Sequence, residues 1–328
     1  MPRFSNPWLR DRGTFVDVLR WKFGRGPEDD VFTKLDDPAE LRPFTSQAPP
    51  AVGEAWRITW LGHASFLLQG HGKSLLIDPI FSDHCSPFPM ERLRRLIPPP
   101  CRLDELPQID AVLLTHSHYD HLDLPSLRKL GADTPMVIAE GHTAWLGKKG
   151  FRQVQELAWF KSLELFPGLR ITATPAQHFT ARTPFDRNRG HWCGWLLENS
   201  GLKLWHAGDS GYCPAFREIG EGLGPIDFAM IPIGAYSPRW FMQDIHMNPE
   251  EAVQAFQDAR CRQAVAMHWG TFRLTDEPMG EPPFRLKAAL AAAGLPEDSF
   301  VVGAAGESWS LPLHGCGGGG KSSGEFGR

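Results

Sequence analysis

The sequence predicts an α/β protein in which two β-sheets pack together and are covered by helices. From Ala55 onward, short apolar runs that are typical of buried strands alternate with turn-forming residues. A few segments with helical periodicity lie between these runs. No repeat of 20–50 residues is present, which excludes a solenoid or a propeller.

The strand predictions rest on apolar runs bounded by Gly, Pro, Asn or Asp. In chain order they cover residues 56–61, 65–69, 74–78, 111–115, 135–139, 170–174, 192–198, 202–207, 228–233 and 263–268.

Two helices have clear end signals. One is expected to begin after Asn248, because Pro249 suits the first helical position and Glu251 completes a capping box. The other is expected over residues 284–294, because Gly294 and Pro296 form a normal helix stop.

The chain is expected to have three parts: an N-terminal extension (1–54), one large domain (55–312) and a disordered Gly-rich tail (313–328). Within the extension, residues 10–25 have the pattern of an amphipathic helix. That helix could pack on the domain or lie at a lipid surface.

Composition narrows the function. The net charge of −4 gives no general attraction for nucleic acid or an anionic membrane. The six cysteines include no CxxC pair, which favours reduced thiols, and no apolar run is long enough for a membrane span. With no N-terminal signal pattern, a cytoplasmic location is expected.

The stretch LLTHSHYDHLD, residues 113–123, carries the chemistry. In extended chain, His116 and His118 point the same way, and after a turn Asp120 and His121 can face a neighbouring point. Imidazole and carboxylate are the ligands that Zn²⁺ prefers, and Fe or Mn accept them as well. Chance would produce this pattern in only about one chain in a thousand. The sequence therefore predicts a metal-binding loop, with enough ligands to begin two sites.

HSHYDH resembles the signature of the metallo-β-lactamase superfamily, whose fold is a four-layer αββα sandwich of two mixed sheets. The resemblance implies two Zn²⁺ ions. His116, His118 and His178 would hold one ion; Asp120, His121 and His268 would hold the other; and Asp209 would bridge them.

Two further residues match superfamily positions behind the ligands. Asp78 resembles an acid that braces the metal loop, although Asp before Pro79 is also a common turn former. His63, in WLGHASF, is expected to support the site from behind, without a more specific role.

The motifs WLGHASFLL, DPIFSDHCSP, GDSGY, IHMNPEEA and HWGTF resemble the phospholipases D that hydrolyse N-acylphosphatidylethanolamine. This resemblance implies cleavage to N-acylethanolamine and phosphatidic acid by a hydroxide that the two metals share. Such a pair can also clamp phosphoryl oxygens. Asp120, Asp209 and His246 are then the expected catalytic residues.

His246 could bind phosphate or protonate the leaving group, or it could be a surface residue at the start of a helix. The stretch from Tyr236 to Met242 has no strand or helix period and is expected to expose its aromatic residues. Tyr236, Trp240 and Phe241 could thus contact acyl chains or the edge of a bilayer, which would make the protein peripheral at the membrane. Buried loop aromatics would look the same.

Other functions share these ligands. A hydrolase of the same fold could act on a soluble phosphodiester, lactone or thioester. A nuclease is disfavoured, because the 58 residues between Asp209 and His268 leave no room for an inserted domain. A non-catalytic scaffold is disfavoured because all seven expected ligands are present.

Overall fold

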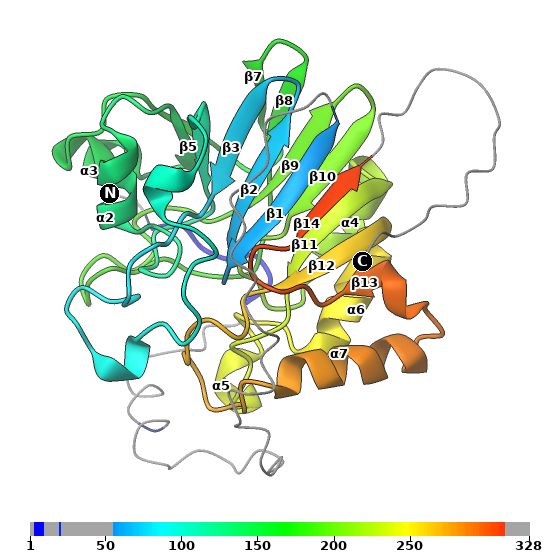
Figure 1. Cartoon of the computed structure of the whole chain (residues 1–328). Helices are drawn as coiled ribbons and strands as arrows, with labels where there is room; N and C mark the ends of the chain where they lie inside the picture. The colour runs from blue at the N-terminus through cyan, green and yellow to red at the C-terminus, as the bar shows by residue number, and fades with distance from the viewer. Residues whose placement is uncertain (1–2, 10–19, 21–54, 312–328) are drawn as a thin grey trace.

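Two seven-stranded sheets lie face to face at the centre of the molecule, and helices cover their outer faces (Figure 1). The computed structural model describes residues 3–9, 20 and 55–311. Two mixed sheets between helices are the αββα sandwich, so the fold class predicted from the sequence is confirmed.

The first sheet has the strand order β14-β1-β2-β3-β4-β5-β6. Pairing is antiparallel from β14 to β3 and parallel from β3 to β6. The strands are β1 (Trp56–Gly62), β2 (Ser65–Gly70), β3 (Lys73–Ile77), β4 (Ala111–Leu114), β5 (Met136–Ala139), β6 (Val154–Leu157) and β14 (Ser308–Leu311).

The second sheet has the strand order β13-β12-β11-β10-β9-β8-β7. Pairing is antiparallel from β7 to β10 and parallel from β10 to β13. The strands are β7 (Ser162–Phe166), β8 (Leu169–Thr174), β9 (Gly194–Asn199), β10 (Leu202–His206), β11 (Ile226–Pro232), β12 (Cys261–Met267) and β13 (Phe300–Val301).

The helices fall into two groups on opposite sides of the sandwich (Figure 1). Helices α2 (Leu124–Leu130) and α3 (Thr143–Lys148) lie beside the first sheet. Helices α4 (Ala215–Gly222), α6 (Pro249–Asp258) and α7 (Glu281–Ala292) lie beside the second sheet, with the short α5 (Arg239–Met242) at the lower end of the view. Three 3-10 turns, Glu91–Leu93, Leu103–Glu105 and Glu297–Ser299, complete the set.

Alternation along the strands divides the apolar residues between two cores. Leu68 and Leu75 belong to the large core between the sheets, whereas their neighbours Leu67 and Leu76 belong to the smaller core under α2 and α3. Successive side chains of a strand point to opposite faces, so one apolar run supplies both layers. Each such buried side chain contributes about 1.5–3 kcal/mol.

The ten predicted strand runs all lie on observed strands, with ends shifted by a residue or two. The sequence did not predict β6, β7, β13 or β14. Their side chains are mostly exposed or half-buried, so they lack the apolar run that marked the others. These four are the edge strands of the two sheets, where fewer side chains are covered by neighbouring strands.

Helix α6 has the predicted capping box: the Asn248 side chain accepts from the Glu251 N–H at 2.9 Å, and Glu251 accepts from the Asn248 N–H. Helix α7 begins at Glu281, three residues before the predicted start. Pro282 and Pro283 hid that first turn, although a helix tolerates proline there because those N–H groups lack partners anyway.

The predicted helix over residues 10–25 lies, apart from Arg20, outside the described residues, and so does the tail from 313. Residues 3–9 of the expected extension contact the domain, through Phe4 and Asn6 among others. The five cysteines within the described part are free thiols. Within that same part, no helix is long and apolar enough to cross a membrane.

Candidate metal centre

The predicted ligands lie where strands end. Strand β4 runs directly into His116, β8 precedes His178, β10 precedes Asp209, and β12 ends one residue before His268. An isolated bridge between Gln177 and Gly211 brings the segments after β8 and β10 together. The fold thereby collects residues that are up to 152 positions apart in sequence.

Three histidines form the first group. The His116 Nε2 and His118 Nδ1 atoms are 2.8 Å apart, and the His118 Nδ1 and His178 Nε2 atoms are 3.1 Å apart. His116 and His178 are fully buried, whereas His118 is half-buried. Their nitrogens lie within 4.8 Å of one another, which is the spacing of ligands around a single ion.

The second group joins Asp120, His121 and His268. Asp120 Oδ2 lies 3.5 Å from His121 Nε2 and 3.4 Å from His268 Nε2. Asp209 faces both groups. Its Oδ2 atom is 3.0 Å from His121 Nε2 and 3.1 Å from His268 Nε2. The same oxygen is 3.6 Å from His178 Nε2 and 3.9 Å from His116 Nε2.

These seven residues fit a pair of metal ions. The His121 and His268 Nε2 atoms and the Asp209 Oδ1 atom are buried, yet no hydrogen bond satisfies them. Buried polar atoms are normally paired, so unpaired nitrogens that converge on carboxylates indicate a bound cation. Ligand atoms about 3.3 Å apart are expected around a tetrahedral ion with bonds of about 2.0–2.1 Å. The cluster can therefore bind metal, and its donors do not specify which one.

The charges of the cluster are set by its carboxylates. Burial raises the pKa of the Asp209 carboxyl, but His121 and His268 outweigh it and hold that pKa well below its usual range. Conversely, burial lowers the pKa of His268, but Asp209 and Asp120 outweigh it and raise the value to about 9. A cation bound between these carboxylates and histidines would take the place of the protons that the raised pKa of His268 favours.

Asp78 lies directly behind the ligands. Its Oδ2 atom is 2.7 Å from His121 Nδ1, and its Oδ1 atom accepts the Thr115 N–H at 2.8 Å. The Thr115 hydroxyl donates to Asp78 and lies 2.9 Å from His116 Nδ1. The predicted bracing position of Asp78 agrees with this geometry, and the contacts orient both His121 and His116.

His63 lies behind Asp120 in the same way. The His63 Nε2 and Asp120 Oδ2 atoms are 2.9 Å apart, and the His63 carbonyl accepts from the His268 N–H at 3.0 Å. His63, Asp120, His121 and His268 offer ligand atoms within 4.8 Å of one another. His63 therefore fixes Asp120 and His268 together, a role that the sequence did not specify.

Three residues at this site have a strained backbone. His63, Asp78 and His268 have φ values of 53°, 43° and 61°, in the left-handed region that residues other than Gly rarely adopt. Such conformations cost about 1–3 kcal/mol each and persist only where surrounding contacts hold them. Here they turn each chain sharply at the end of a strand, so that the side chain faces the cluster.

His246 lies inside the site and not on the surface. It is 9% exposed, and its ring centroid is 5.0 Å from that of His178 and 5.2 Å from that of His268. His178, Asp209 and His246 offer ligand atoms within 4.8 Å of one another. Burial holds the pKa of His246 well below its usual range, which favours a neutral ring.

The expected aromatic surface from Tyr236 to Met242 is largely wrong. Tyr236 is 1% exposed, and its hydroxyl donates to Glu281 at 2.7 Å, so it has no exposed face for a substrate. Trp240 and Phe241 are half-buried on helix α5, where the sequence predicted irregular chain, and Met242 is buried. A single helical turn is too short to display an amphipathic period, which is why the pattern was missed.

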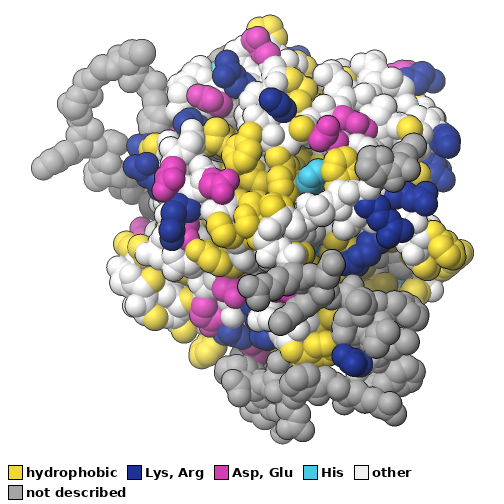
Figure 2. Space-filling model, turned by 180° about the vertical axis from the view of Figure 1, so that it is seen from behind, with side chains coloured by type: hydrophobic (Ala, Val, Ile, Leu, Met, Phe, Trp, Pro, Cys, Tyr) yellow, Lys and Arg dark blue, Asp and Glu magenta, His cyan; other side chains and the backbone are white. Residues whose placement is uncertain are grey.

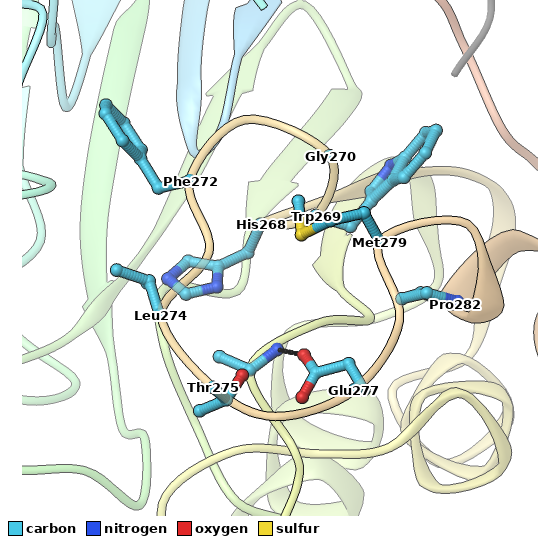
Figure 3. A pocket seen from close by; sticks show the side chains of 10 residues that line it. His268, Trp269, Gly270, Phe272, Leu274, Thr275, Glu277, Met279 and Pro282 are labelled. Atoms are coloured by element: carbon cyan, nitrogen blue, oxygen red, sulfur yellow. Dashed lines mark hydrogen bonds between the residues drawn. The ribbon is translucent and has the colours of Figure 1, made fainter. Parts of the chain in front are cut away.

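A small cavity of about 10 Å³ lies beside His268, between Gly270, Thr275 and Glu277 (Figure 3). Glu277 there accepts from the Ala235 N–H at 2.6 Å, the bond drawn in the figure. This volume holds about one water molecule. The cavity is therefore too small for a phospholipid headgroup, and among the seven candidate ligands His118 is the most exposed.

One supporting residue, Arg182, could not be recognised from sequence patterns. Its Nη1 atom donates to the carbonyls of Ser117 and Leu122, at 2.8 Å each, and its guanidinium stacks 3.9 Å from the centroid of the Tyr119 ring. These contacts hold the metal loop from a segment 60 residues away. A lone arginine in a loop carries no pattern that could have predicted them.

Residues 73–269 match the family described as the beta-lactamase superfamily domain. With the sandwich fold and the His/Asp cluster, the match defines the class of protein: the chain belongs to the metallo-β-lactamase superfamily and is a metal-dependent hydrolase.

Three similar proteins give more detail. N-acyl-phosphatidylethanolamine-hydrolyzing phospholipase D 1 of Caenorhabditis elegans is 37% identical over 76% of this chain and 74% of the nematode protein. The mitochondrial N-acyl-phosphatidylethanolamine-hydrolyzing phospholipase D of Saccharomyces cerevisiae is 35% identical over 74% of this chain, but the match covers only 53% of the yeast protein. The structure of Igni18, a metallo hydrolase from Ignicoccus hospitalis, has 26% identity and a TM-score of 0.59 over 79% of this chain and 99% of that chain.

Proposed function

We propose that this hydrolase is a dinuclear phosphoric diester hydrolase of phospholipase D type, which cleaves N-acylphosphatidylethanolamine to N-acylethanolamine and phosphatidic acid. The observation that carries the proposal is the position of Asp209, whose Oδ2 atom faces ligand nitrogens of both histidine groups at 3.0–3.9 Å. The similarity to the nematode and yeast phospholipases supports the choice of substrate.

Two bound ions, which we propose to be Zn²⁺ with Fe or Mn as alternatives, would lower the pKa of a shared water and polarise the phosphoryl oxygens. The chain's own residues set the geometry for this chemistry. Asp120 and Asp209 supply negative charge between the histidines, Asp78 holds the His121 ring, and His63 holds the Asp120 carboxylate. Each position is therefore held before a substrate arrives.

His246 is proposed to contact the phosphoryl group or the leaving group. Its ring lies between those of His178 and His268, and its Nδ1 atom is buried without a hydrogen-bond partner among the described residues. The low pKa that burial gives His246 favours a neutral ring that donates or accepts one hydrogen bond. This position supports a role of His246 in orienting the substrate.

The loop after His178 offers contacts for an amphiphilic substrate. The Phe179 ring lies 4.5 Å from the His118 ring, and the Arg187 guanidinium lies 4.2 Å from the centroid of Phe179. In the same loop, Phe185 is 78% exposed. Figure 2 shows a face on which apolar side chains gather beside one histidine, with basic residues on one side and a mixture of acidic and basic residues on the other. Cationic and apolar groups together suit a phospholipid, and they replace Tyr236 as candidate substrate contacts.

The test is hydrolysis, by protein of known metal content, of three substrates side by side: N-acylphosphatidylethanolamine in mixed micelles, bis-p-nitrophenyl phosphate, and a soluble lactone or thioester. The Asp209→Ala variant is the control. Release of N-acylethanolamine that disappears in the control is the expected result. Turnover of only a soluble substrate, with two metals bound, would contradict the lipid assignment and leave a hydrolase of soluble esters.

A further inference from the structure

An N-terminal arm, residues 3–9, lies against the loop that follows His178. Along the arm the side chains of Phe4, Asn6 and Trp8 are half-buried, and the residues between them are exposed. This alternation is the pattern of an extended segment with one face on the protein. The arm is more than 160 residues away in sequence from the loop that it covers.

Aromatic contacts dock the arm at both ends. The Phe4 N–H donates to the Asn188 carbonyl at 2.9 Å, and the Phe4 ring lies 4.5 Å from the His191 ring. The Trp8 ring stacks on that of Trp159, with centroids 5.7 Å apart and an interplanar angle of 15°. Neither anchor touches a metal ligand.

Asn6, between the two anchors, does touch one. Its Nδ2 atom donates to the backbone carbonyl of His178 at 2.5 Å. A carbonyl only accepts hydrogen bonds, so the amide nitrogen of Asn6 must face it. This orientation leaves Asn6 Oδ1 buried without a partner among the described residues, a cost that the bond to His178 has to offset.

The bond completes the support of His178. Its Nδ1 atom lies 3.0 Å from the Ile245 carbonyl, which turns Nε2 toward the metal cluster. The preceding peptide is held by the Gln177 N–H, which donates to Ser210 Oγ at 2.8 Å. The His178 side chain is fully buried, so water does not readily replace the Asn6 amide at its carbonyl.

We propose that Asn6 is a positioning residue of the metal centre: the arm carries its amide to the His178 carbonyl and thereby fixes the ligand nitrogen of His178. The proposal rests on the metal site of the proposed function and not on the choice of substrate. Its test therefore measures metal binding, which lipid specificity does not affect.

The decisive variant is Asn6→Asp, in the full-length protein, because Asp has the same shape but lacks the N–H donor. Loss of such a supporting contact typically weakens metal binding by about 10–100-fold. We expect metal release to a chelator to become at least about 10-fold faster, with a changed visible absorption of the Co²⁺-loaded protein. Ser5→Ala, at an exposed neighbour on the arm, should match the wild type.

A structural role alone would give another result. If Asn6→Asp lowers the melting temperature of the metal-free protein while metal release and the Co²⁺ spectrum stay as in the wild type, the proposal is overturned. If that variant fails to fold, Asn6→Ala is read in the same way. In a His178→Ala background, Asn6→Asp should have no further effect on the remaining metal. An undiminished effect there would equally overturn the proposal, because the effect would not pass through His178.

Discussion

Two clusters of buried histidines within the described residues have opposite properties. In the metal centre, unpaired ring nitrogens of His121 and His268 face Asp120 and Asp209. In the second cluster, which comprises His142, His191, Trp159 and Trp192, backbone groups satisfy the rings: His142 Nε2 lies 2.9 Å from the His191 carbonyl, and the Trp192 N–H donates to His191 Nδ1 at 2.9 Å.

The difference shows what makes a buried histidine a ligand. Burial lowers the pKa of His191 to about 4 and also lowers that of His142, so both rings stay neutral. Buried carboxylates raise the pKa of His121 well above its usual range and that of His268 to about 9. Burial alone therefore does not identify a metal site. Converging carboxylates and unpaired nitrogens do.

The largest contrast is expected from one substitution made in each cluster. His116→Ala removes a ligand, and hydrolysis should fall by roughly 1,000-fold with loss of bound metal. His142→Ala should leave metal content and turnover unchanged but lower the free energy of unfolding by about 1–3 kcal/mol, because it leaves the His191 carbonyl without a donor. Metal analysis, kinetics and urea unfolding check both. If His142→Ala also lost metal, the proposed contrast between a metal-binding cluster and a purely structural one would be wrong.

Substitution of His246 tests whether this residue contacts the substrate or binds metal. His246→Gln keeps a hydrogen-bonding group but removes the ring, and kcat/KM is expected to fall by about 100-fold with two metals retained. Steady-state kinetics on metal-analysed protein measure this. Should the variant instead lose one equivalent of metal, His246 would be an eighth ligand, as its proximity to His178 and Asp209 allows.

Substitution of Asp78 tests how much a residue behind the ligands contributes to metal affinity. Asp78→Asn weakens the acceptor that faces His121 Nδ1 at 2.7 Å, so metal affinity should fall by roughly 10–100-fold. Competition with a chelating dye gives the affinity. The matched control is Asp110→Asn, which removes a carboxylate paired with Lys73 just before β4 and should bind metal normally. Equal losses in both variants would mean that Asp78 acts through the strand and not through His121.

The smallest effect concerns the second cluster and pH. The pKa of His191 is about 4 in the folded protein and about 6.5 when unfolded, so the unfolded state binds the proton first as pH falls. Stability from this neutral ring is fully present above pH 6.5 and is lost as pH falls to about 4, by up to about 1.4 kcal/mol for each pH unit. At low pH, where His142 also becomes protonated, its charge would lower the pKa of His191 further.

Urea unfolding of the metal-free wild type and of His191→Phe, between pH 7 and pH 4, measures this slope. The free energy of unfolding of His191→Phe should fall less over that range than that of the wild type, whatever the difference between the two proteins at pH 7. Parallel curves would show that the pKa of His191 is the same in the folded and unfolded states, and would contradict the prediction.

The sequence alone determined the metal loop. His116, His118, Asp120 and His121 lie within six residues, so their convergence needs only local chain geometry, which a spacing rule can predict. The strands were predicted for a similar reason: buried strands need apolar runs, and the runs are visible. The positions of His178, Asp209 and His268 came from resemblance, because each is a single residue at the end of a strand.

Only the tertiary structure decided which residues support and surround that loop. Asn6, His63, Thr115 and Arg182 act on ligands through hydrogen bonds whose partners are mostly far away in sequence. The burial of Tyr236 likewise depends on Glu281, 45 residues later. Such contacts are set by how the sheets and loops pack, and one side chain carries no period that would reveal them. The local sequence pattern thus specifies the ligands that lie close together in the chain. The packing of distant segments then fixes the orientation of those ligands.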